Sequence, residues 1–106
     1  MNIKELSERA LYIRSLYRKK EQKKYKREWT REDLMLGMIG DIGDLAKIVL
    51  AHEGIRDLDN KEEKLKHELS DCLWSILILS HEYGIDLEKE FLLAMDGLKA
   101  KLQANV

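Results

Sequence analysis

The segment LMLGMIGDIGDLAKI, residues 34–48, decides the fold of this 106-residue chain. Its apolar residues recur every three or four positions, which predicts an amphipathic helix. The seam of that helix consists of Leu34, Met38, Asp41, Leu45 and Ile48. A carboxylate therefore stands in the middle of an apolar stripe. Glycines occupy positions 37, 40 and 43, and each lowers helix stability by about 1 kcal/mol relative to alanine. We interpret these glycines as leaving one side of the helix without side chains, so that a ligand or another helix can approach its backbone.

Three further segments show the same helical periodicity on either side of this one. The first stripe ends at residue 17, where the basic segment RKKEQKKYKR, residues 18–27, begins. The stripes are Ile3, Leu6, Ala10, Ile13 and Tyr17; Leu65, Leu69, Cys72, Ile76, Leu79 and Tyr83; and Phe91, Met95, Leu98 and Leu102. The chain has no proline, and 44% apolar with 37% charged residues is typical of long amphipathic helices. We predict an all-α fold, a four-helix bundle forming one domain over residues 1–106.

Short polar motifs predict where these helices begin and end. Thr30 followed by Asp33 predicts an N-cap for the second helix, onto which Trp29 can pack as a hydrophobic staple. Gly54 and Gly84 are expected to end the second and third helices. Asp86 is expected to cap the fourth.

The third helix is apolar on nearly every side between Leu69 and Leu79, which predicts burial all round. Four helices seldom enclose one of their number, so we predict a homodimer or homotetramer. Cys72 lies in this run and is expected to be a buried small hydrophobe. A single cysteine and the absence of an apolar signal segment or a ~20-residue apolar run predict a cytoplasmic protein that does not enter a membrane.

Two pairs of carboxylates, Asp41 with Asp44 and Glu68 with Asp71, are each spaced three residues apart and so share a helix face. Residues 44 and 68 have their midpoint at residue 56, and so do residues 41 and 71. Residue 56 lies in the predicted turn. An antiparallel hairpin therefore places Asp44 opposite Glu68 and Asp41 opposite Asp71. Four carboxylates beside an apolar seam repel one another, and an all-oxygen ligand set favours Mg²⁺, with Mn²⁺ also suitable.

The motifs GDIGDLAKIV and HELSDCLWSILILSHEYGIDLEKEF resemble the MazG-like nucleotide pyrophosphohydrolases, the all-α group that includes the dimeric dUTPases. The resemblance covers about residues 29–98. The family carries Glu-x-x-Glu on one helix and Glu-x-x-Asp on the next. Glu68 and Asp71 match the second motif, whereas Asp41 and Asp44 stand where the family usually has glutamates. Gly40 falls where many members carry another acidic residue.

The resemblance implies hydrolysis of a nucleoside triphosphate to a monophosphate and pyrophosphate. It also implies that Asp41, Asp44, Glu68 and Asp71 are the catalytic and metal-binding residues, holding Mg²⁺. Because aspartate is shorter than glutamate, two alternatives remain open. One is a non-catalytic nucleotide-binding or helical interaction module with a weakened site, and the other is a purely structural bundle.

Other residues carry weaker signals. The basic segment 18–27 has seven Lys or Arg residues in ten and can meet a triphosphate or form a solvated helix end. Trp29 and Trp74 can stack on a base or pack in the core. The net charge of −1 argues against a nucleic-acid partner. His67 opens an incomplete zinc motif that lacks its second histidine, so zinc is not expected.

Overall fold

The computed structural model describes residues 1–104, and this part of the chain is helical without strands. The four helices are α1 (Ile3–Tyr25), α2 (Arg31–His52), α3 (Lys61–Glu82) and α4 (Leu87–Ala104). The prediction of an all-α fold with four helices is confirmed. No helix among these residues combines the length and apolar character that a membrane crossing requires.

The structure confirms the predicted capping residues at the start of α2 and α4 and the glycines that follow α2 and α3. The Asp33 backbone N–H donates to the Thr30 hydroxyl at 3.2 Å, and the Thr30 N–H donates to the Asp33 carboxylate at 2.9 Å. This capping box satisfies two backbone donors at the start of α2. Gly54 and Gly84 follow α2 and α3 with φ values of +76° and +66°, in the left-handed region that glycine adopts without strain. The Asp86 carboxylate accepts a backbone N–H from the first turn of α4 at 3.2 Å.

The helix α1 differs from the expectation in its buried face. It continues to Tyr25, through most of the basic segment, because the Lys, Glu and Gln residues of that segment are good helix formers. Ile13 and Tyr17 of the predicted stripe are exposed. Arg14 and Glu21 take their place and are 1% and 4% exposed, joined by an ion pair of 2.8 Å. The stripe was wrong here because a charged pair can be buried when its members neutralise each other.

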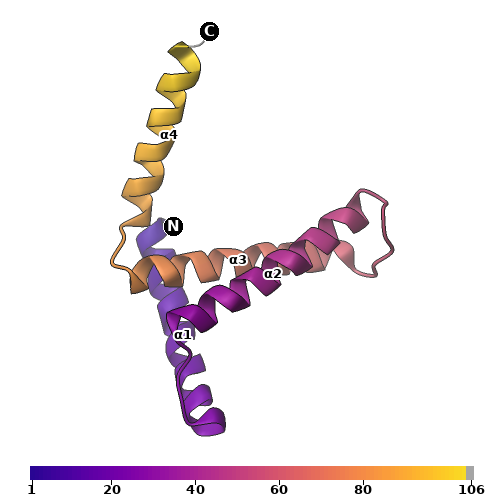
Figure 1. Cartoon of the computed structure of the whole chain (residues 1–106), viewed down its shortest axis with the longest axis vertical. Helices are drawn as coiled ribbons and strands as arrows, with labels where there is room; N and C mark the ends of the chain where they lie inside the picture. Colours follow the sequence, from indigo (N-terminus) through magenta and orange to yellow (C-terminus); the bar gives the residue numbers. More distant parts are fainter. Residues whose placement is uncertain (105–106) are drawn as a thin grey trace.

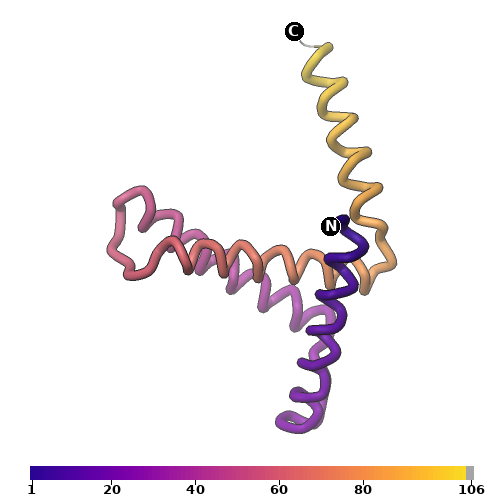
Figure 2. Tube along the Cα trace, turned by 180° about the vertical axis from the view of Figure 1, so that it is seen from behind, coloured from indigo at the N-terminus to yellow at the C-terminus, as the bar shows by residue number. Residues whose placement is uncertain are grey.

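The helices α2 and α3 form an antiparallel hairpin, and α1 crosses this hairpin near its open end (Figures 1 and 2). The main core lies at that crossing and consists of Ala10, Leu34, Leu77 and Ile78. The Trp74 indole N–H, from α3, donates to the Ala10 carbonyl of α1 at 3.2 Å. On α2 every residue of the predicted seam, including Asp41, is buried or half-buried. The hairpin is thus anchored at one end, and its other end carries the turn.

The helix α4 extends away from the other three, and none of its residues up to Ala104 is buried (Figure 1). The radius of gyration is 17.1 Å, against about 13 Å expected for a compact domain of this size. The predicted α4 stripe is exposed, as are Leu69 and Ile76 of the α3 stripe, so α3 is not buried all round within one chain. Cys72 is buried, as predicted. Residues 1–104 of one chain do not form a closed bundle (Figure 1), and the oligomer stays a prediction.

Candidate metal centre

The hairpin brings three of the four predicted carboxylates into one group. Carboxylate oxygens of Asp41, Asp44 and Glu68 lie within 4.8 Å of one another. Asp41 and Glu68 are half-buried between α2 and α3, while Asp44 is exposed. Asp71 belongs to an overlapping group with Glu68 and His67, within the same distance. The two groups share Glu68, which makes this residue the centre of the acidic site.

One oxygen of Glu68 has no partner. Its Oε2 atom is buried and accepts no hydrogen bond from the residues that the structure describes. A buried carboxylate oxygen without a donor is energetically unfavourable, so such an atom requires an explanation. An oxygen-preferring cation beside Asp41, Asp44 and Glu68 would satisfy it.

Two residues of the group, Asp41 and Glu68, have raised pKa values. Burial is the main cause of the raised pKa of Asp41, followed by repulsion from Asp71 and Asp44. Burial also raises the pKa of Glu68 first, and the charges of Asp41, Asp71 and Asp44 add to it. The charge of His67 acts in the opposite direction on both residues. The group therefore holds more negative charge than its surroundings stabilise, as expected of a site for a cation.

Sequence reasoning considered His67 only as half of a zinc motif. Its Nε2 atom lies 3.1 Å from an Asp71 carboxylate oxygen, one helical turn further along α3. The spacing of four residues was the available signal for this pair. With one imidazole among several carboxylates, the donor set still favours Mg²⁺ or Mn²⁺ over zinc.

A hollow of about 460 Å³ lies beside Asp41 and Asp71. We call it the aromatic hollow because three aromatic rings line it. Its lining residues are Ile13, Arg14, Tyr17, Glu21, Trp29, Gly37, Asp41, Ser70, Asp71 and Trp74. The rings of Tyr17 and Trp74 meet edge to face, with centroids 5.8 Å apart. Gly37 contributes backbone to this wall, and a Cβ built on it meets nothing within 4 Å, so the missing side chain leaves open space here.

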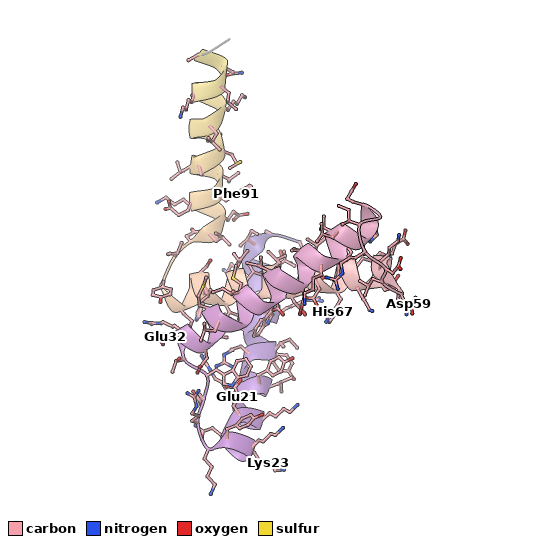
Figure 3. The ribbon with its side chains drawn as sticks, turned by 45° about the vertical axis from the view of Figure 1, so that its right-hand side comes forward. Glu21, Lys23, Glu32, Asp59, His67 and Phe91 are labelled. Atoms are coloured by element: carbon pink, nitrogen blue, oxygen red, sulfur yellow. The ribbon has the colours of Figure 1, made fainter. Side chains whose placement is uncertain are left out.

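Three residues fix one wall of the aromatic hollow, and sequence reasoning missed two of them. The buried Arg14 donates to the Trp29 carbonyl at 3.0 Å, and the Trp29 N–H donates to Glu21 Oε1 at 2.8 Å. The ion pair of Arg14 and Glu21 thus ties the loop before α2 to α1. The Glu21 label in Figure 3 marks this junction. Hydrogen bonds to charged groups are among the stronger ones, so Trp29 is held in place.

A second hollow, of about 280 Å³, lies on the other side of the carboxylates, toward the α2–α3 turn. We call it the cationic hollow. Its lining residues are Asp44, Lys47, Ile48, Arg56, Leu58, Lys64, His67 and Glu68. None of the seven Lys and Arg residues of segment 18–27 lines either of these two hollows. Figure 3 places Lys23 near the free tip of α1 and His67 along the hairpin.

Comparisons with models of known protein families, with characterised proteins and with solved structures find no match for this chain. The functional assignment therefore rests on the residues and their geometry.

Proposed function

We propose that this protein is a Mg²⁺-dependent nucleoside triphosphate pyrophosphohydrolase of the MazG-like type, yielding a nucleoside monophosphate and pyrophosphate. One observation carries the proposal. Oxygens of Asp41, Asp44 and Glu68 lie within 4.8 Å of one another, and a buried Glu68 oxygen has no donor among residues 1–104. A purely structural bundle gains nothing from an unsatisfied, mutually repelling group of this kind.

The chemistry of the donor set fits Mg²⁺, because carboxylate oxygens are the ligands that this ion prefers. Asp41, Asp44 and Glu68 would hold it, with Asp71 at the adjoining position. When bound, the ion neutralises charge on phosphate oxygens and lowers the pKa of a bound water.

The chain's own residues supply the remaining functions. A water oxygen forms a bond to the α-phosphorus, and the P–O bond to the β-phosphate breaks with its electron pair leaving on pyrophosphate. The water's proton passes to a carboxylate of the acidic group. The aromatic hollow receives the nucleoside, with the Trp29 and Trp74 rings available for contact with a base.

We further propose that a second copy of the chain completes the helical bundle. The stripe of Phe91, Met95, Leu98 and Leu102 on α4 is exposed throughout, and Leu69 and Leu73 on α3 are also exposed. Apolar stripes of this length are buried in stable proteins, and a homodimer or homotetramer buries them. Figure 3 shows Phe91 on the lower part of α4, which extends away from the hairpin.

The test is a pyrophosphate-release assay over a panel of ribo- and deoxyribonucleoside triphosphates, with Mg²⁺ and with a chelator. We compare Glu68→Gln with Glu62→Gln, an exposed residue on the same helix. We expect Mg²⁺-dependent pyrophosphate that falls by at least about 10²-fold in Glu68→Gln and is retained in Glu62→Gln.

Two outcomes would contradict the proposal. Absence of pyrophosphate over the whole panel in a folded protein would favour a non-catalytic binding module. Release of orthophosphate alone would place the cleaved bond elsewhere in the triphosphate.

A further inference from the structure

The three cations of the cationic hollow, Lys47, Arg56 and Lys64, are exposed and unpaired. None of them lies within 4.0 Å of a carboxylate oxygen among residues 1–104. In contrast, Arg18 and Arg31 both pair with Glu82. The cations of the hollow are therefore free to meet an anion from solution.

These cations come from three consecutive parts of the hairpin. Lys47 lies on α2 three residues beyond Asp44, and Lys64 lies on α3 four residues before Glu68. Arg56 belongs to the turn between the two helices. The midpoint of 47 and 64 is 55.5, so the pairing that brings the carboxylates together also brings these lysines to matched height. The two lysines stand about one turn nearer the loop than Asp44 and Glu68, and Arg56 lies in the loop itself.

The acidic group, which comprises Asp41, Asp44, Glu68 and Asp71, lies between the aromatic hollow and the cationic hollow. Asp41 and Asp71 line the aromatic hollow, while Asp44 and Glu68 line the cationic hollow. From Gly37 in the first to Lys47 in the second, α2 rises about 15 Å. A ligand that reaches from one to the other has a flat apolar end and an anionic end. The acidic group then lies at the junction between them.

We propose that the cationic hollow binds the pyrophosphoryl part of the substrate, the β- and γ-phosphates, through Lys47, Arg56 and Lys64. The inference rests on the proposed function and fixes the direction in which the nucleotide lies. The nucleoside occupies the aromatic hollow, the α-phosphorus lies at the carboxylates, and the leaving group faces the turn. When the bridging P–O bond breaks, its electron pair stays on pyrophosphate, whose charge these cations stabilise.

The opposite direction is disfavoured by charge. A phosphate tail in the aromatic hollow would meet the carboxylates of Glu21, Asp41 and Asp71 with only the buried, already paired Arg14 to oppose them. The cationic hollow offers three unpaired cations against Asp44 and Glu68. The polyanionic end of the substrate therefore prefers the turn.

The test is calorimetric titration of the full chain with inorganic pyrophosphate in the presence of Mg²⁺. We expect Lys47→Ala, Arg56→Ala and Lys64→Ala each to weaken pyrophosphate affinity by about tenfold, because each removes one charge-assisted contact. Lys66→Ala is the matched control, since Lys66 lies two residues after Lys64 on another face of α3, pairs with Glu63 and lines neither hollow. Lys47→Arg should restore most of the affinity, and nucleoside monophosphate affinity should stay unchanged in all variants.

The readouts separate this inference from the proposed function. If the wild type hydrolyses nucleotides but the three alanine variants keep full pyrophosphate affinity, the cationic hollow is not the subsite and the enzyme assignment stands. If no nucleotide is hydrolysed while pyrophosphate binds in a manner that depends on these cations, the subsite stands and the enzyme assignment fails. Equal weakening of monophosphate and pyrophosphate binding would overturn the direction. All variants are at exposed positions, and circular dichroism checks that they fold.

Discussion

Two groups of charged residues beside α3 differ in how their charges are paired. Where α1 meets the loop before α2, the buried Arg14 and Glu21 neutralise each other, and both Glu21 oxygens accept hydrogen bonds, although the Arg14 Nε atom has no partner among residues 1–104. In the hairpin, Asp41, Asp44 and Glu68 converge without a cation, and a buried Glu68 oxygen accepts no hydrogen bond from these residues. We call the first group the closed pair and the second the open group. The comparison indicates that buried charge holds the structure together in one place and remains available to a ligand in the other.

The largest effect is expected from breaking the closed pair. Glu21→Gln leaves the Arg14 guanidinium, 1% exposed, without its counter-charge. Removing one partner of a buried pair costs about 3–5 kcal/mol, so we expect the free energy of unfolding in urea to fall by that amount. The exposed Glu28, 3.9 Å from Arg18, is the matched control, and Glu28→Gln should change stability by less than about 1 kcal/mol.

A double variant sharpens this prediction. Arg14→Met with Glu21→Leu removes both charges and should recover part of the stability that Glu21→Gln loses. If Glu21→Gln and Glu28→Gln lowered the free energy of unfolding equally, Arg14 and Glu21 would not be a stabilising buried pair, and the contrast with the open group would fail.

The next effect concerns the side-chain length of the two aspartates in the open group. Replacing Asp41 and Asp44 together by Glu moves each carboxylate about 1.5 Å further from α2. Because the aspartate oxygens already lie within 4.8 Å of Glu68, we expect misplacement and a loss of about 10²-fold in pyrophosphate release. A gain in activity would contradict this and indicate a site weakened by its aspartates. Kinetics of the double variant beside the wild type, at saturating Mg²⁺, give the answer.

The open group was accessible from the sequence, and the closed pair was not. Helical periodicity puts Asp41 and Asp44 on one face of α2. In an antiparallel hairpin, residues equally far from the turn lie at the same height, so the shared midpoint at residue 56 places Glu68 opposite Asp44. The same arithmetic would have found Lys47 opposite Lys64. Arg14 and Glu21 could not be predicted, since polar residues seven apart on a basic helix are normally solvated. Only the position of Trp29 after folding shows that both are enclosed.

The position of α4 relative to the other helices also could not be predicted from the sequence. Its stripe, including Phe91 and Met95, predicts burial against an apolar surface but does not say which chain provides that surface. The same ambiguity applies to Leu69 on α3. Periodicity specifies a buried face, whereas the identity of the partner depends on contacts between elements distant in sequence or in another molecule.

Alanine at the helical glycines tests whether the open side of α2 has a function. A Cβ at Gly37 or Gly40 meets nothing within 4 Å, so each alanine should raise the free energy of unfolding by about 1 kcal/mol. Gly37 lines the aromatic hollow, and Gly37→Ala should therefore also raise the KM for the nucleotide. Gly40→Ala, the matched control, should leave KM unchanged. Destabilisation by Gly40→Ala would instead indicate that a second chain approaches α2 at this point.

The smallest effect is the pH dependence of stability that the open group contributes. Because Asp41 and Glu68 have raised pKa values, the folded metal-free protein holds their protons more tightly than the unfolded chain does. Their contribution to stability is therefore greatest at low pH and falls as pH rises from the ordinary carboxyl pKa range through the raised values. Mg²⁺ binds the ionised carboxylates, so in its presence this contribution should rise with pH over the same window.

Urea unfolding between about pH 4 and about pH 7, with a chelator or with Mg²⁺, measures both slopes. Asp33 has a lowered pKa and contributes with the opposite sign, so the signal is the difference between wild type and Asp41→Asn. We expect that difference to shrink as pH falls and to reverse its sign when Mg²⁺ replaces the chelator. A difference independent of both pH and Mg²⁺ would mean that Asp41 behaves as an ordinary solvated carboxylate. The hairpin would then hold no open group, and the contrast with Arg14 and Glu21 would lose its functional meaning.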